Sequence, residues 1–111
     1  MKLRWIAVPA AAAVMMFAGQ ANAAMDQTAA LALAKKSGCL ACHSIEKKVV
    51  GPAWQDVANK YKGADEKARL IAKVKAGGKG VWGEVPMPPY SPRVADADIE
   101  GLVDFVLSLA K

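Results

Sequence analysis

Residues 39–43, Cys-Leu-Ala-Cys-His, constrain this 111-residue chain more than any other segment. Cys39 and Cys42 are the only cysteines, and His43 is the only histidine. Two thiols separated by two residues can form thioether bonds to the two vinyl groups of one haem, and a histidine directly after them can donate a ring nitrogen to the iron. The motif therefore predicts one covalently attached haem c, with His43 as a metal ligand.

Three other interpretations of this motif fit its surroundings less well. A thioredoxin-like Cys-x-x-Cys lies between a strand and a helix, and no strand pattern precedes Cys39. A structural zinc ion needs four ligands, which two cysteines and one histidine cannot supply. A disulfide between the cysteines could form in an oxidising compartment, but it gives His43 no role.

The N-terminal residues have the pattern of an export signal. Two basic residues precede an apolar run of roughly 14 residues, and Ala-Asn-Ala at positions 21–23 is a small-x-small cleavage site. The run is shorter than the ~20 residues that a membrane-spanning helix needs, which argues against an uncleaved anchor. We predict a signal peptide over residues 1–23, a mature domain over residues 24–111, and a periplasmic location.

The charge of the mature domain does not predict a nucleic-acid partner. Two of the 15 Lys and Arg residues belong to the leader and all ten Asp and Glu residues follow it, so thirteen basic against ten acidic residues leave a formal charge of +3. So small an excess, with few aromatic residues, is not typical of nucleic-acid binding. A chain this short builds one domain with a modest core, of which the haem would be part.

The rest of the chain has the pattern of helices separated by turns. The expected bounds are residue 26 to about 37, residue 52 to about 60, residue 65 to the pair 77–78, and about 97 to 109. Asp26 and Asp65 are the expected N-caps, Pro52 suits a first turn, and Gly38 ends the first helix. We predict an all-α fold of about four helices wrapped around one covalent haem.

The second axial ligand decides what the iron does. After the leader the chain has two methionines, Met25 and Met87, and no second histidine. Met25 lies at the start of the first expected helix, whereas Met87 lies in Val-Pro-Met-Pro-Pro over residues 85–89, where prolines remove backbone freedom. A rigid loop can hold a weak thioether on iron, so Met87 is the predicted second ligand. Two filled axial sites indicate electron transfer, whereas an unbound Met87 would indicate a haem peroxidase or a gas-binding sensor.

In this combination the motifs resemble the class I monohaem cytochromes c of bacteria, in particular the short periplasmic five-fifty-one type. The matching segments are Gly-Cys-x-x-Cys-His at 38–43, Val-Gly-Pro-Ala at 50–53, Gly-Val-Trp-Gly at 80–83, Pro-Met-Pro-Pro at 86–89 and Phe-Val-Leu-Ser at 105–108. The resemblance covers the chain from the first helix to its end. It implies a small class I cytochrome c fold and an electron carrier that is not an enzyme.

The resemblance also implies roles for residues around the haem. Pro52 matches a residue whose carbonyl accepts a hydrogen bond from the proximal imidazole. Trp82 matches an indole that donates to a haem propionate, with a buried packing aromatic as the alternative. Lys73 stands where an arginine often shares that propionate, and Tyr90 stands where an asparagine often bonds the methionine sulfur.

The expected partners are other redox proteins. The resemblance implies nitrite reductase, a cytochrome oxidase or a peroxidase as the acceptor and a quinol-oxidising complex as the donor, and the sequence does not choose among them. Lysines that flank the haem-binding segments are predicted to steer docking onto acidic surfaces. These lysines are Lys35, Lys36, Lys47, Lys48, Lys75 and Lys79. No general base, nucleophile or substrate pocket is evident, so we expect a monomeric carrier without a small-molecule substrate.

Overall fold

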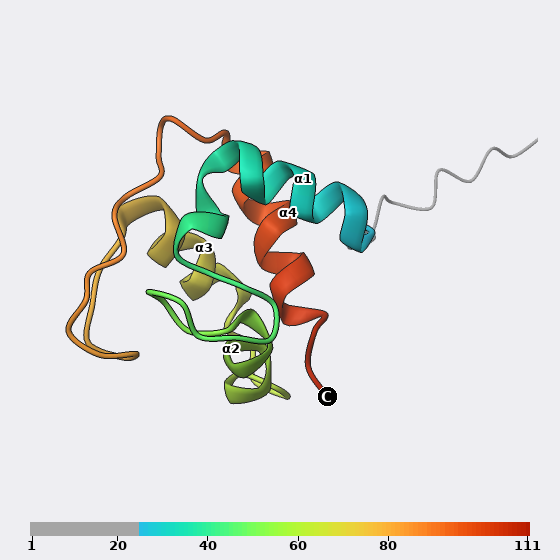
Figure 1. Cartoon of the computed structure of the whole chain (residues 1–111), viewed down its shortest axis with the longest axis vertical. Helices are drawn as coiled ribbons and strands as arrows, with labels where there is room; N and C mark the ends of the chain where they lie inside the picture. The colour runs from blue at the N-terminus through green and yellow to red at the C-terminus, as the bar shows by residue number, and fades with distance from the viewer. Residues whose placement is uncertain (1–24) are drawn as a thin grey trace, which may run out of the picture.

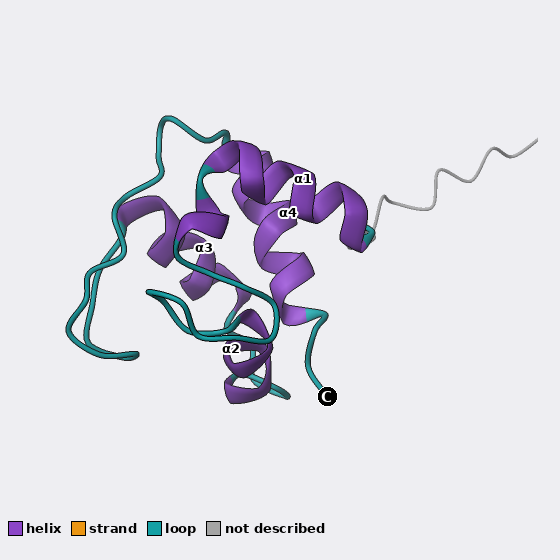
Figure 2. Ribbon diagram, viewed as in Figure 1, coloured by secondary structure: helices purple, strands orange, loops and turns teal. Residues whose placement is uncertain are grey.

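The computed structural model describes residues 25–111, so the predicted signal peptide lies outside the described residues. Its regular elements are α1 (Gln27–Ser37), η1 (Cys39–Ala41), α2 (Trp54–Lys60), α3 (Lys67–Ala76) and α4 (Asp96–Leu107). Figure 2 shows that long loops join them, above all the loop between α3 and α4 at the left edge of the view. The predicted all-α fold is confirmed. No helix over residues 25–111 combines the length and the apolar composition needed to cross a bilayer.

Helix α4 is the element on which α1, α2 and α3 all pack (Figure 1). Its apolar residues Ile99, Leu102, Val103 and Phe105 recur at three- and four-residue spacing and are buried. Leu102 and Phe105 belong to a core cluster with α1 and α2, whereas Ile99 and Val103 pack against α3 and the loop before α4. One amphipathic helix thus connects two core clusters.

Helix α1 begins and ends as predicted. Asp26 is its N-cap, and the Asp26 carboxylate accepts a hydrogen bond of 2.8 Å from the N–H of Ala29. Gly38 ends the helix in the left-handed conformation, with a φ of 88°, and its N–H donates back to the last turn. The chain therefore turns directly from α1 into η1, which carries Cys39.

Two predicted helix starts are wrong. Helix α2 begins at Trp54, so Pro52 precedes the helix instead of lying in its first turn, and its carbonyl is free to accept a bond from another segment. Helix α3 begins at Lys67 with Glu66 at the N-cap position, so Asp65 is not the cap. The φ and ψ of Glu66, −112° and 3°, are not the extended values at which a side chain usually caps a helix.

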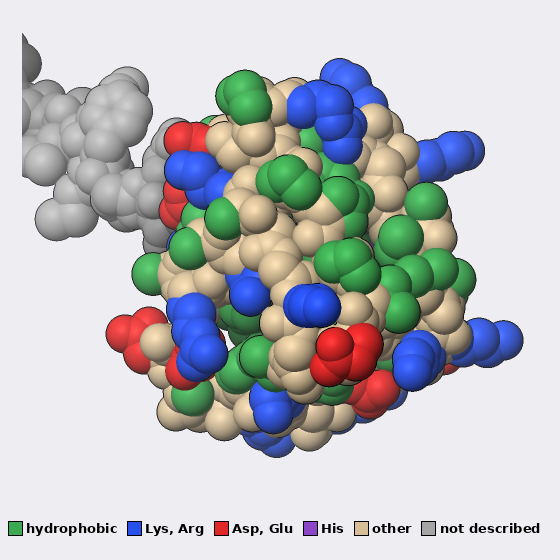
Figure 3. Space-filling view, turned by 90° about the vertical axis from the view of Figure 1, so that its left-hand side faces the viewer, with side chains coloured by type: hydrophobic (Ala, Val, Ile, Leu, Met, Phe, Trp, Pro, Cys, Tyr) green, Lys and Arg blue, Asp and Glu red, His purple; other side chains and the backbone are tan. Residues whose placement is uncertain are grey.

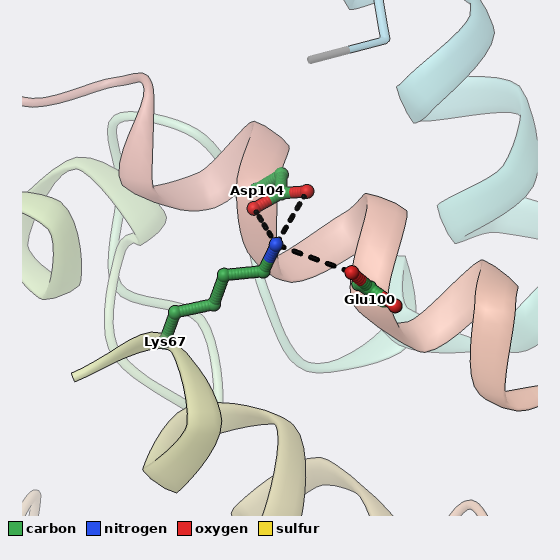
Figure 4. A network of polar contacts seen from close by, with 3 residues as sticks. All are labelled: Lys67, Glu100 and Asp104. Atoms are coloured by element: carbon green, nitrogen blue, oxygen red, sulfur yellow. Dashed lines mark hydrogen bonds and ion pairs between the residues drawn. The ribbon is translucent and has the colours of Figure 1, made fainter. Parts of the chain in front are cut away.

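The start of α3 is instead held by an ionic network with α4, shown in Figure 4. The ammonium of Lys67 lies 2.9 Å from the Asp104 carboxylate and 3.2 Å from that of Glu100. The hydrogen bonds that Lys67 donates to Asp104, and then to Glu100, raise the pKa of Lys67. Since the two carboxylates lie one turn apart on α4, a single lysine holds the first turn of α3 against that helix.

Candidate haem-binding site

A cavity of about 290 Å³ lies between α2, α3, α4 and the two loops that follow η1 and α3. The face that carries the loop after α3 is hollowed between apolar side chains (Figure 3). The wall of the cavity includes all seven residues that the sequence predicts for the site. They are Cys39, Cys42, His43, Pro52, Lys73, Trp82 and Met87. The fold therefore brings together residues that lie up to 48 positions apart.

The two cysteines are held in register by η1. The N–H groups of Cys42 and His43 both donate to the carbonyl of Cys39, at 3.1 and 3.0 Å. Both thiols are free, with Cys39 buried and Cys42 partly exposed. Burial raises the pKa of the Cys39 thiol, and the positive charge of Arg93 opposes that rise. Two free thiols on one cavity wall fit two thioether bonds.

The imidazole of His43 is oriented by three neighbours. Its Nδ1 donates to the carbonyl of Pro52 at 2.8 Å, and in the neutral ring this tautomer leaves the lone pair of Nε2 available to a metal. The ring stacks on Trp54 at 5.6 Å between centroids and an interplanar angle of 24°. Gly51 permits this packing, because a Cβ at that position would lie 2.6 Å from His43 Cε1. These three contacts hold the ring in one orientation, with Nε2 left available to a metal.

Met87 is tied by its backbone to Gly78. The Met87 N–H donates to the Gly78 carbonyl at 2.8 Å, and the Gly78 N–H donates to the Met87 carbonyl at 3.0 Å. Gly77 has a φ of 73°, and a Cβ there would lie 2.9 Å from the carbonyl carbon of Pro88. The glycine pair expected only to stop α3 therefore also holds the Met87 loop. One sign of this second role is present in the sequence: two glycines stand together at positions 77 and 78, although a single glycine is enough to end a helix.

Met25, the other methionine considered, is part of the packing between α1 and α4. It packs against the first core cluster, and its Cε would lie 3.0 Å from a Cβ at Gly101 of α4. Among the residues described by the structure, those on the cavity wall do not include Met25. Only Met87 therefore brings a thioether to the wall.

Trp82 and Lys73 bring polar groups to the same wall. Trp82 lies on the cavity wall and is 41% exposed. The ammonium of Lys60 lies 5.6 Å from the centre of a Trp82 ring. Lys73 lies on α3, and its ammonium would be 2.6 Å from a Cβ at Gly78. An indole N–H and two ammonium groups in this region suit an anionic group.

The donor set of the cavity fits one covalently attached haem. Two thiols, an oriented imidazole, a thioether and cations for acidic groups accompany apolar side chains that include Leu70, Val74 and Leu102. A small all-α domain with such a site defines a monohaem electron carrier as a class.

Comparison with known proteins agrees, and the chain belongs to the cytochrome c family, which matches residues 27–110. Cytochrome c-552 of Nitrosomonas europaea is 47% identical over 110 residues, which cover 98% of this chain and 99% of that protein. Cytochrome c-551 of Allochromatium vinosum is 58% identical over 80 residues, which cover 71% and 84%. The crystal structure of Nitrosomonas europaea cytochrome c552 matches with a TM-score of 0.67 at 50% identity, over 71% of this chain and 98% of that one.

These likenesses confirm the resemblance to the small class I cytochromes c. With them, the expected haem c and the expected role in electron transport are confirmed as well. The relatives are named as cytochromes, consistent with a carrier, and the peroxidase or sensor alternative is not favoured.

Proposed function

We propose that this protein is a periplasmic electron shuttle in which haem c is attached to Cys39 and Cys42 and ligated by His43 and Met87. A bound haem supplies a one-electron couple, which methionine ligation shifts to higher potential. The observation that carries the proposal is that all four side chains line one cavity, with the free Nε2 of His43 set by Pro52.

The remaining residues of the wall tune and hold this group. The carbonyl of Pro52 accepts a hydrogen bond from His43 Nδ1–H, which increases the basicity of the imidazole as a ligand. Trp82 donates its indole N–H to a propionate, and Lys73 supplies a positive charge to the same group. Lys73 acts as a point charge, because an ammonium lacks the two-pronged geometry with which arginine binds a carboxylate.

The protein meets its partners through the face around the cavity, where Lys and Arg side chains lie among apolar ones (Figure 3). Lys75 and Lys79 each pair with a carboxylate, that of Asp96 at 3.2 Å and that of Glu84 at 3.7 Å. The steering charge therefore comes mainly from four exposed lysines of the predicted set. These are Lys35, Lys36, Lys47 and Lys48.

Such charges attract acidic surfaces over distances near the Debye length and support brief, small contacts. The acceptor is a nitrite reductase, a cytochrome oxidase or a peroxidase, and the donor is a quinol-oxidising complex. The protein works as a monomer, performs no catalysis of its own and takes no small-molecule substrate. A rate of electron transfer to such a partner that did not fall with rising salt would contradict the steering.

The test of the ligand set is the absorption spectrum of the holoprotein in both oxidation states, with carbon monoxide added to the reduced form. We expect a low-spin reduced spectrum unaffected by carbon monoxide, and the weak red band of a methionine–iron bond in the oxidised form. Met87→Ala should remove the band and admit carbon monoxide, whereas Met25→Leu should change neither. Rapid binding of carbon monoxide by the unaltered protein would instead support the peroxidase or sensor alternative.

A further inference from the structure

Arg93 links the loop that follows Met87 to the end of α1. Its Nη2 donates to the carbonyl of Ser37 at 3.2 Å, and its Cζ lies 5.1 Å from the centre of the Tyr90 ring. Ser37 is the last residue of α1, where carbonyls have no partner within the helix, and it precedes Cys39 by two positions. One side chain thus bridges the segment with the first haem-binding cysteine and the segment with the candidate methionine ligand.

Tyr90 is the point at which the Met87 loop is anchored in the core. It is 7% exposed and packs in the second core cluster with Ile99 and Val103, and its N–H donates to the carbonyl of Val74 at 3.1 Å. Burial raises the pKa of the Tyr90 phenol, so the ring stays neutral beneath the guanidinium. Only two prolines separate Tyr90 from Met87, and their fixed φ angles transmit the position of one to the other.

The chemistry of this contact favours an arginine. A planar guanidinium can lie flat on an aromatic ring and still donate at its edge to a carbonyl, whereas an ammonium is a compact, strongly hydrated charge without that planar geometry. Lys35 and Lys36 already supply positive charge to the last turn of α1, so Arg93 is not needed there for charge alone. Its distinct contribution is the mechanical link between α1 and Tyr90.

We propose that Arg93 is a positioning residue for Met87, which clamps Tyr90 to the end of α1 and restricts the movement by which Met87 would leave the iron. The inference rests on the proposed function, since it takes Met87 as the iron ligand. Without the clamp, the loop after the two prolines can shift away from α1 while the rest of the cavity wall stays in place.

The test titrates the oxidised holoprotein with imidazole, which competes with methionine for the iron. We expect Arg93→Gln to bind imidazole about fivefold more tightly than the unaltered protein. This corresponds to about 1 kcal/mol of binding free energy, since a tenfold change in affinity is ~1.4 kcal/mol. The red band of the methionine–iron bond should also disappear at a lower temperature. Arg93→Lys should resemble Arg93→Gln, and if it behaves like the unaltered protein, charge alone suffices and the clamp is wrong.

Two controls separate the clamp from other effects. Lys62→Gln removes a positive charge at an exposed position away from the cavity wall and should leave imidazole affinity unchanged. Tyr90→Phe keeps the ring and should also match the unaltered protein. If Tyr90→Phe reproduces the increase, the phenol hydroxyl and not Arg93 holds Met87, and the inference is overturned.

The outcome also distinguishes this inference from the proposed function. An unaltered protein with the methionine band, together with an Arg93→Gln variant of unchanged imidazole affinity, contradicts the clamp and leaves the His43–Met87 ligand set standing. An unaltered protein without the band contradicts the ligand set itself. An Arg93→Gln variant that unfolds at lower denaturant without binding imidazole more tightly assigns Arg93 a purely structural role and overturns the clamp.

Discussion

Replacing Gly51 with alanine tests whether the absent side chain at this position lets the His43 ring take its place. A Cβ there would lie 2.6 Å from Cε1, 3.0 Å from Nδ1 and 3.1 Å from Nε2 of the imidazole. Carbon atoms pack at about 3.5–4.0 Å, so the ring must move by roughly 1 Å. Gly51 is not among the glycines with positive φ, so the cost arises from this contact and not from backbone strain.

The cost can be worked from the contacts of the ring. Forcing a methyl group into a packed site costs about 1–3 kcal/mol, and the loss of the 2.8 Å bond from Nδ1 to Pro52 costs about 1 kcal/mol more. Alanine restores about 0.4–1 kcal/mol by reducing the freedom of the unfolded chain. We expect the free energy of unfolding of the holoprotein to fall by about 2 kcal/mol, with an altered haem spectrum.

Denaturant unfolding followed by haem absorbance measures both effects. Gly63→Ala is the matched control, because Gly63 has a φ of 79° and no atom within 4 Å of a Cβ. It should lower stability by about 1–2 kcal/mol through left-handed backbone strain while leaving the spectrum unchanged. A Gly51→Ala protein with unaltered spectrum and stability would refute the reasoning.

Three further substitutions have defined outcomes. Asp26→Ala should lower the free energy of unfolding by about 1 kcal/mol, and Asp26→Asn should largely preserve it, as thermal melts will show. Lys67→Met should lower the free energy of unfolding at neutral pH. Because the pKa of Lys67 is raised in the folded state, this loss of stability should persist up to the unfolded pKa near ~10.4. The loss should then shrink as pH rises through the folded pKa. A difference that stayed constant across alkaline unfolding curves would count against the ion pair. Gly77→Ala places a side chain on a residue with positive φ and crowds Pro88, so carbon monoxide should displace Met87 in the reduced protein. A reduced spectrum that does not change with carbon monoxide would contradict this prediction.

The helices could be predicted from the sequence where their signals are local. Asp26 and Gly38 bound α1 as expected, since a cap involves only the nearest turn of the chain. Pro52 and Asp65 were misleading because more distant contacts act on the starts of α2 and α3. The Pro52 carbonyl accepts a hydrogen bond from the His43 ring nine residues away, and Lys67 binds carboxylates on α4.

The residues on the cavity wall that belong to the candidate site could also be predicted, but the residues that support them could not. All seven predicted residues line the cavity. They could be predicted because a motif or the family resemblance identifies each of them. The supporting roles of Gly51, Gly77 and Arg93 were not predicted, since each depends on a neighbour that only the folded chain places beside it. A glycine in a sequence indicates backbone freedom, and only the folded chain shows which atom needs the space.

The loop of Met87 is restrained by contacts from two different segments, Gly77 at the end of α3 and Arg93 after Tyr90. Gly77 lets the backbone pass beneath Met87 on the side of α3, and Arg93 clamps the far end to α1 through Tyr90. If the two restraints act independently, their free energies add, and the Gly77→Ala, Arg93→Gln double variant should increase imidazole affinity by the product of the two single fold-changes. An increase well below that product would mean that releasing either end already frees the loop. Gly77 and Arg93 would then act as one cooperative restraint on Met87, and the prolines beside Met87 would not be stiff enough to make the two contacts independent.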